Sequence, residues 1–225
     1  MERIIKDKKE LVKLVSFLTM CDGGLYVKTK RKDGDSSKCN PFFVMNNCSE
    51  QYIEYAVSIL RNVTGTTVYN TKDYNVDGYN RKPKQRLQTQ RHPFFRPMWK
   101  RTYNSGYKGL DTHVLKMMDV ECLAMLYMAD GSICYKGDAI SSVTLNTKRL
   151  TEGDNRFLSF CINQTFDIES TVNRQKQYTY IRIKGKSVYR FFELIKPFVL
   201  TDFNYKIPND NLLLKYKQDG DIVCS

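Results

Sequence analysis

The sequence predicts a mixed α+β protein made of two halves that share one order of elements. Several segments carry apolar residues at helical spacing, and shorter segments alternate polar and apolar residues as half-buried strands do. The segments follow one another in the same order twice, as helix, two strands, helix, two strands and helix. We therefore expect one repeat in residues 1–112 and a second in residues 113–225. A chain of 225 residues can bury a large apolar core.

In the first half, an apolar helix is expected over residues 5–22, followed by strands at 24–32 and 41–47. A helix over 49–63 can begin at Ser49, whose hydroxyl suits an N-cap. Strands at 66–72 and 85–91 and a short helix over 93–103 complete this half.

The second half repeats this series. Asp119 can cap a helix that ends at Asp130, and strands follow at 132–136 and 141–148. Thr151 can cap a helix that runs to about residue 164, with Asp154 at the capping-box position. The last elements are strands at 167–174 and 178–185 and a helix over 187–198.

The strands present one apolar face and one face of basic, amide and aromatic side chains, because successive residues point to opposite sides of a sheet. Such side chains can bond phosphates and base edges in a DNA groove. Exposed strands also show polar residues to water, but these faces are basic and almost free of acids. The candidate DNA-binding residues are Lys28, Lys30, Lys32, Arg86, Gln88, Gln90, Lys136, Asn146, Lys148, Asn173, Arg182 and Lys184.

The charge of +12 suits an anionic partner such as nucleic acid. The charged N-terminus has no signal-peptide pattern, and no apolar run reaches the length of a membrane span. We therefore expect a protein that is not secreted, in the cytoplasm of a bacterium or phage-infected cell or in an organelle matrix. With only two histidines, a His-rich zinc site is excluded.

An Asp-Gly pair ends an apolar helical segment in each half, at Asp22 and at Asp130. A carboxylate is disfavoured at a helix C-terminus, typically by about 0.3–1 kcal/mol. Asp-Gly is also a common turn, so one such site alone would favour a structural explanation. Two matched sites favour a divalent cation, which carboxylates bind and which can assist phosphodiester hydrolysis.

The segment "LAMLYMADG" resembles the signature of the LAGLIDADG homing endonucleases, with matches at Leu123, Ala124, Leu126, Ala129, Asp130 and Gly131. "VSFLTMCDG" matches more weakly, at Leu18 and the final Asp22-Gly23. "SVTLNTKRLT" and residues 191–210 are also similar to the second half of single-chain family members of the omega-intron type.

This resemblance implies two pseudo-symmetric αββαββα repeats with the motif helices packed at the centre and two antiparallel sheets forming a DNA-binding saddle. It implies a monomeric Mg²⁺-dependent endonuclease that cuts both strands of a long asymmetric DNA target during intron homing, with Mn²⁺ able to substitute. The lack of splicing-domain motifs implies a free-standing protein.

The resemblance also assigns the site residues. Asp22 and Asp130 would bind the metal through their carboxylates, and Cys21 and Ala129 through their backbone carbonyls. A basic catalytic residue is expected beside each acid. The expected residues are Lys206 in "NYKIPN" and Lys108 in "GYKGLD". For each lysine, simple contact with a DNA phosphate is the alternative role.

Two other functions stay open. The fold also serves RNA-binding intron maturases, so intron RNA is a second candidate partner. A non-cleaving DNA-binding protein is the other alternative. The presence of both aspartates favours the nuclease.

Overall fold

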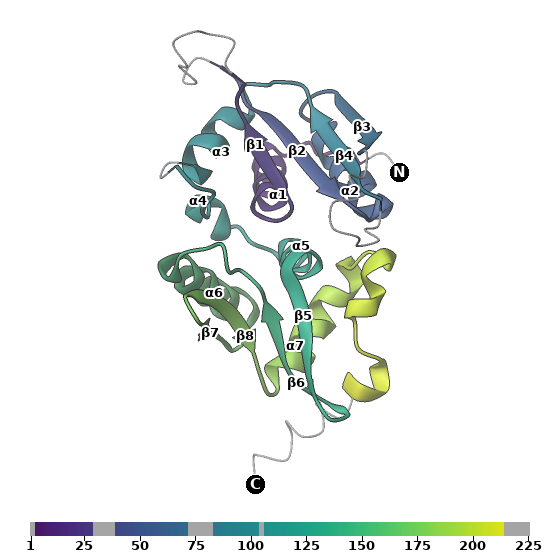
Figure 1. Cartoon of the computed structure of the whole chain (residues 1–225), viewed down its shortest axis with the longest axis vertical. Helices are drawn as coiled ribbons and strands as arrows, with labels where there is room; N and C mark the ends of the chain where they lie inside the picture. Colours follow the sequence, from purple (N-terminus) through teal and green to yellow (C-terminus); the bar gives the residue numbers. More distant parts are fainter. Residues whose placement is uncertain (1–2, 29–38, 72–82, 104–105, 214–225) are drawn as a thin grey trace. The chain divides into compact units, whose positions relative to one another are not determined.

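The computed structural model describes residues 3–28, 39–71, 83–103 and 106–213. The chain divides into two compact units, Met1–Tyr107 (unit 1) and Lys108–Ser225 (unit 2). Each unit has its own four-stranded sheet and its own helices (Figure 1).

Unit 1 contains three helices and four strands within its described residues. Its sheet has the order β1-β2-β4-β3, and every neighbouring pair of strands is antiparallel. The elements are α1 (Lys8–Met20), β1 (Gly23–Tyr26), β2 (Phe42–Asn47), α2 (Glu50–Leu60), β3 (Thr66–Asn70), β4 (Gln85–Thr89) and α3 (Phe95–Thr102).

Unit 2 repeats this arrangement with the strand order β5-β6-β8-β7, again wholly antiparallel. The predicted mixed α+β class with two similar halves is thereby confirmed. The elements are α4 (Thr112–Leu115), α5 (Val120–Asp130), β5 (Gly131–Lys136), β6 (Ala139–Leu145), α6 (Glu152–Phe166), β7 (Ser170–Gln175), β8 (Tyr178–Ile183), α7 (Ser187–Ile195), and the 3-10 helices η1 (Lys196–Phe198) and η2 (Thr201–Lys206).

Side-chain caps fix the starts of three helices, as the sequence predicts. The Ser49 hydroxyl accepts a hydrogen bond from the Tyr52 amide, and the Asp119 carboxylate accepts one from the Cys122 amide. Thr151 and Asp154 form the expected capping box at the start of α6. Each cap satisfies an amide that has no partner within its own helix, which typically stabilises a helix by about 1 kcal/mol.

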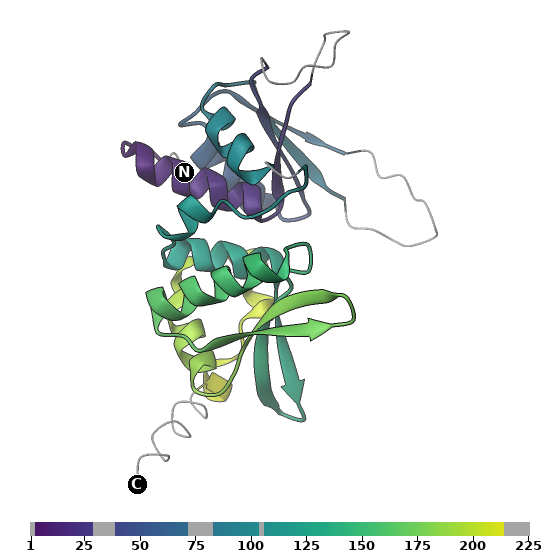
Figure 2. The same cartoon turned by 90° about the vertical axis from the view of Figure 1, so that its left-hand side faces the viewer.

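One face of each sheet is covered by helices, and this face forms the core of the unit. In unit 2, Ile181 and Ile183 of β8 are fully buried on the helix side, while Tyr178 on the same strand is exposed. Figure 2 shows α6 lying over one side of the β7–β8 hairpin. Burying one such isoleucine contributes about 1.5–3 kcal/mol, so the apolar residues determine which sheet face stays open.

The first helix is shorter than predicted. The sequence predicts a helix over residues 5–22, but α1 ends at Met20, and Asp22 lies in the turn that follows. Cys21 closes the last turn through its amide, which donates to the Phe17 carbonyl, and its backbone then leaves the helical region. The four-residue helix α4 and the 3-10 helices were not predicted from the sequence.

Within the described residues, no helix has both the length and the apolar character needed to cross a membrane.

Candidate active site

Asp130 is the last residue of α5 and leads directly into β5. The seven residues before Ala129 in α5 are all buried, while the Asp130 side chain keeps 21% of its surface exposed. Its backbone carbonyl accepts a 2.8 Å hydrogen bond from the Asn146 amide, which joins the end of α5 to the end of β6. The carboxylate is therefore held at the open end of a rigid helix.

Arg149 lies beside this carboxylate. Its Nη2 donates to Asp130 Oδ2 over 3.2 Å from the loop between β6 and α6. The sequence analysis did not single out Arg149, because it is distant from the motif along the chain. The match of "SVTLNTKRLT" to the family, which contains Arg149, was the one available signal.

The electrostatic environment of Asp130 has two opposing parts. Burial raises the pKa of the Asp130 carboxyl, because the charged form loses water. The positive charges of Arg149, Lys108 and Lys206 oppose this effect and favour the carboxylate. A half-buried acid surrounded by cations is an arrangement that is enriched at functional sites.

Lys206 closes the C-terminus of α5. Its Nζ donates a 2.7 Å hydrogen bond to the Met128 carbonyl and lies 5.7 Å from the centre of the Phe203 ring. The buried Tyr127 hydroxyl donates a second hydrogen bond, to the backbone carbonyl of Lys206. Two hydrogen bonds therefore join the end of η2 to α5. A cation at this helix end also complements the negative end of the helix dipole.

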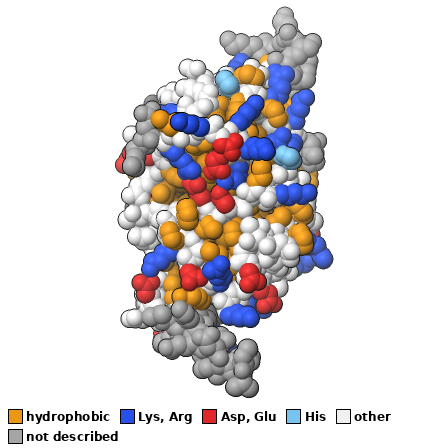
Figure 3. Space-filling view, turned by 180° about the vertical axis from the view of Figure 1, so that it is seen from behind, with side chains coloured by type: hydrophobic (Ala, Val, Ile, Leu, Met, Phe, Trp, Pro, Cys, Tyr) orange, Lys and Arg blue, Asp and Glu red, His pale blue; other side chains and the backbone are white. Residues whose placement is uncertain are grey.

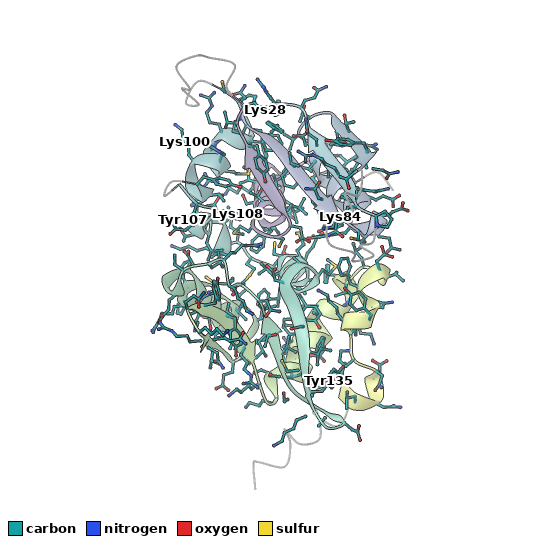
Figure 4. The ribbon with its side chains drawn as sticks, in the orientation of Figure 1. Lys28, Lys84, Lys100, Tyr107, Lys108 and Tyr135 are labelled. Carbon is teal, nitrogen blue, oxygen red and sulfur yellow. The ribbon has the colours of Figure 1, made fainter. Side chains whose placement is uncertain are left out.

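Lys108, which is labelled in Figure 4, is the first residue of unit 2, and its charge acts on Asp130. The resemblance instead pairs Lys108 with the first acid, Asp22. The structure thus brings both expected lysines into the surroundings of Asp130.

Asp22 has a different environment. It lies in the turn between α1 and β1, is exposed, and accepts a 3.0 Å hydrogen bond from the Asn47 side-chain amide at the end of β2. Asn47 was not among the residues singled out from the sequence. Its position follows from the pairing of β1 with β2, which brings the end of β2 beside the Asp-Gly turn.

The glycine after each acid is required by close packing. A Cβ on Gly131 would lie 2.1 Å from the Tyr127 ring and 2.5 Å from the Tyr127 carbonyl oxygen. A Cβ on Gly23 would lie 2.2 Å from the Phe43 ring and 2.7 Å from the Leu18 carbonyl oxygen. In both units the strand can therefore leave the helix directly behind the acid.

The donors at the end of α5 fit a hard divalent cation. The Asp130 carboxylate and the Ala129 carbonyl both belong to the last helical turn, where carbonyl groups lack helical partners. Hard cations such as Mg²⁺ prefer oxygen ligands of these two kinds. In unit 1, the carboxylate of Asp22 and the carbonyl of Cys21, the C-cap residue after α1, offer the same donor types.

The open sheet faces carry several of the predicted DNA-binding residues. Arg86 and Gln88 alternate with the buried Leu87 and Thr89 on β4, and Arg182 alternates with buried isoleucines on β8. The remaining predicted residues that the structure describes lie at strand ends, in flanking loops or on β7. They are Lys28, Gln90, Lys136, Asn146, Lys148, Asn173 and Lys184. Lys30 and Lys32 lie outside the described residues.

Strand pairing adds residues to these faces that the sequence analysis did not include. Asn46 of β2 and Tyr69 of β3 are the direct neighbours of Arg86. In unit 2, Ser132 and Thr144 pair across β5 and β6, with their hydroxyl oxygens 2.7 Å apart. These four residues could not be identified as parts of the open faces without the register of the strands. On the side of unit 2 shown in Figure 3, by contrast, basic and acidic side chains are interspersed.

The chain matches the model of the LAGLIDADG DNA endonuclease family over residues 18–191. It is also 28% identical over 109 residues to a "Probable intron-encoded DNA endonuclease 3" of Mycosarcoma maydis, an alignment that covers 48% of this chain and 74% of the relative.

Two solved structures resemble this chain over nine-tenths or more of its length. A homing endonuclease, I-WcaI, bound to its DNA recognition sequence superposes with a TM-score of 0.70 at 19% identity, covering 90% of this chain and 88% of the other. A second endonuclease, I-SmaMI, bound to cleaved DNA, gives a TM-score of 0.55 at 10% identity, covering 100% and 94%. At these identities the likeness concerns the fold.

Proposed function

The chain belongs to the LAGLIDADG DNA endonuclease family, and we propose that it is a site-specific endonuclease that cuts both strands of duplex DNA with Mg²⁺. The observation that carries this proposal is the placement of Asp130, a half-buried carboxylate at a helix end beside Arg149, Lys206 and Lys108. An acid in that setting contributes little to stability, but it suits a metal-assisted attack on a phosphodiester.

The proposed metal ligands are the carboxylates of Asp22 and Asp130 with the backbone carbonyls of Cys21 and Ala129. The two halves, residues 1–112 and 113–225, would each supply one acid. A bound Mg²⁺ activates water and stabilises the oxygens of the phosphodiester displacement, and Mn²⁺ offers a similar charge. The chain's own residues hold the oxygen ligands at rigid positions, since each acid is followed by a glycine that cannot be enlarged.

Lys206 and Lys108 would favour the ionised form of Asp130 and stabilise negative charge on the phosphate during the reaction. Lys206 is well placed for this because its ammonium group is held by the Met128 carbonyl. Arg149 would neutralise Asp130 in the free protein and contact phosphate once a cation binds there. These roles require DNA to lie across the ends of α5 and β6.

The open sheet faces would bind the DNA. The proposed contacts are the described residues Lys28, Arg86, Gln88, Gln90, Lys136, Asn146, Lys148, Asn173, Arg182 and Lys184, together with Lys30 and Lys32. Unit 1 presents Arg86 and Gln88 where unit 2 presents Tyr180 and Arg182, so one chain would read two different half-sites. A monomer would therefore recognise a long and asymmetric target.

The test is incubation of the full-length protein with a randomised duplex library, in Mg²⁺ or in EDTA, followed by sequencing of the cut ends. The proposal predicts one long consensus that is cut on both strands in Mg²⁺ and is not cut in EDTA. Duplex binding without cutting in Mg²⁺ or Mn²⁺ would contradict it and favour a non-cleaving DNA-binding protein. A preference for structured intron RNA without any cutting would favour a maturase.

A further inference from the structure

Arg182 is the arginine of unit 2 that lies in the middle of the open sheet face. It is on β8, where its strand neighbours are Thr144 of β6 and Thr171 of β7. Ile181 and Ile183, on either side along the chain, are buried beneath the sheet. Alternation along the strand therefore puts the half-buried Arg182 on the open face, between two short hydroxyl side chains.

A serine holds the guanidinium group of Arg182. Its Nε donates a 2.9 Å hydrogen bond to the Ser142 hydroxyl on β6. Ser142 is fully buried, so this oxygen is a fixed anchor and not a mobile surface group. Because Nε is engaged, the plane of the guanidinium is set, and the two terminal nitrogens form the far edge of the side chain.

Arg182 also differs from the other arginines of unit 2. Within residues 108–213, each of the others bonds to a carboxylate. These pairs are Arg149 with Asp130, Arg156 and Arg174 with Glu152, and Arg190 with Glu193. Among these same residues Arg182 has no carboxylate partner, and its side chain bonds to a neutral hydroxyl. The sheet therefore presents a positive charge that is oriented but not neutralised.

The inference rests on the proposed function, because that function makes duplex DNA the ligand of the open sheet face and hence of Arg182. We infer that Arg182 recognises a guanine in the major groove through two parallel hydrogen bonds to O6 and N7, with Ser142 as its positioning residue. An arginine fork matches these two acceptors, and guanine is the base that presents both in the major groove. A buried anchor holds the fork ready for both bonds at once.

The corresponding residue in unit 1 is Gln88. It pairs with Val44 of β2 and Thr67 of β3, in the place that Arg182 takes between Thr144 and Thr171. A glutamine matches adenine in the major groove. The two half-sites should therefore differ at this equivalent position, with guanine read by unit 2 and adenine by unit 1.

The test is selection of a randomised duplex library for binding to the full-length protein in EDTA, so that cleavage plays no part. The parent should select a consensus with one G·C pair that depends on Arg182. In R182A this pair alone should lose its preference, by about 5- to 150-fold. In R182Q the preference at this pair should move toward A·T. R174A is the matched control, because Arg174 lies on the helix side of the same sheet and pairs with Glu152.

The positioning role of Ser142 has its own variants. S142A should weaken the preference for the same G·C pair without changing other positions, and S142T, which keeps a hydroxyl, should restore it. Thermal unfolding of each variant identifies those that fail to fold. R182Q changes the side-chain volume less than R182A, and S142A changes it less than S142T, which adds a methyl group at a buried position.

Three results would overturn the inference. A consensus that is unchanged in R182A would show that Arg182 reads no base. An affinity that falls uniformly over all sequences would show a phosphate contact instead. A parent protein that binds DNA without selecting any consensus would overturn the proposed site-specific function as well. The first two results would overturn only the role of Arg182.

Discussion

The two Asp-Gly turns have the same backbone role but different surroundings. Asp22 is exposed and bonded to the neutral amide of Asn47, whereas Asp130 is half-buried and bonded to the charged Arg149. Asn47 is the last residue of the second strand of unit 1, and Arg149 lies in the connection that follows the second strand of unit 2. Three residues lie between Met45, the strand partner of Gly23, and the N-cap Ser49, but five lie between Leu145, the partner of Gly131, and Thr151.

This difference shows how a duplicated fold can acquire unequal sites. The longer connection in unit 2 places Arg149 beside the carboxylate of Asp130, while in unit 1 the Asn47 side chain donates a hydrogen bond to Asp22. The helix, the glycine and the strand order are kept in both units. The loop length therefore differs between the two units without a change in the frame that holds each acid.

Of the substitutions that distinguish the Asp130 site from the Asp22 site, one at Lys206 is expected to have the largest effect on the cleavage rate, because Lys206 lies beside Asp130. K206M should lower the rate of Mg²⁺-dependent cleavage by about 100-fold while DNA binding is largely retained, because a preorganised positive charge is lost. K206R should recover part of the rate. The measurement is single-turnover cleavage of the selected target.

K196M is the matched control, since Lys196 has the same charge, pairs with Asp210 and takes no part in the proposed site. If K206M unfolded at lower temperature but cut at the parent's rate once folded, Lys206 would have only the structural role of closing α5.

The packing of the two turns can be compared through their glycines. G131A should destabilise the protein by about 2–3 kcal/mol, because the added methyl group overlaps the backbone of Tyr127 as well as its ring. G23A should destabilise it somewhat less, because its added methyl group would lie 2.7 Å from the nearest backbone atom, the Leu18 carbonyl oxygen, against 2.5 Å for G131A. Denaturant unfolding measures both changes.

Gly153 in α6 is the control glycine, since its added Cβ would meet only the Thr151 hydroxyl at 3.8 Å. G153A should stabilise the protein by about 0.5–1 kcal/mol. Equal effects of all three substitutions would mean that the turns are not tightly packed.

The role of Arg149 can be tested by making the second site resemble the first. R149Q should bind Ca²⁺ at Asp130 more tightly in the absence of DNA, by up to about five-fold, because a competing cation is removed. Titration calorimetry measures this affinity, and the gain should disappear in R149Q/D130N. The control R156Q removes a surface arginine that pairs with Glu152. Equal Ca²⁺ affinities in R149Q and the parent would show that Arg149 does not compete for Asp130.

The smallest effect concerns stability. Burial raises the pKa of Asp130 in the folded protein, so ionising this acid at neutral pH opposes folding. D130N should therefore raise the free energy of unfolding at pH 7, by about 0.3–1 kcal/mol from the helix dipole alone. The gain should vanish as the pH falls below the ordinary carboxyl pKa, where the acid is protonated in both states.

The exposed Asp138 in the β5–β6 turn is the control, and D138N should change stability by less than about 0.5 kcal/mol at either pH. A D130N protein that is less stable than the parent at pH 7 would show that the ion pair with Arg149 outweighs the effect of burial.

Much of the fold could be predicted from the sequence, because its signals are local. The alternation of Arg182 with two isoleucines indicates the buried face of β8, and Ser49, Asp119 and Thr151 indicate where helices begin. The end of α1 was predicted two residues too late, because apolar spacing continues past the point where Cys21 leaves the helical region.

The surroundings of the two acids were harder to predict because they depend on contacts between distant segments. Arg149 is 19 residues from Asp130, and Lys206 reaches the Met128 carbonyl from 78 residues away. Asn47 approaches Asp22 only through the pairing of β1 with β2. Motif residues could be assigned from the sequence, whereas their partners required the register of strands and the path of loops.

The most direct test of the account is cleavage of a supercoiled plasmid that carries the selected target, by the parent and by D22N, D130N and D138N. The account predicts that the parent and D138N produce linear DNA in Mg²⁺ but not in EDTA, and that neither D22N nor D130N does so while both still bind the target. If D22N and D130N produced linear DNA at the parent's rate, the two Asp-Gly turns would not be the active sites.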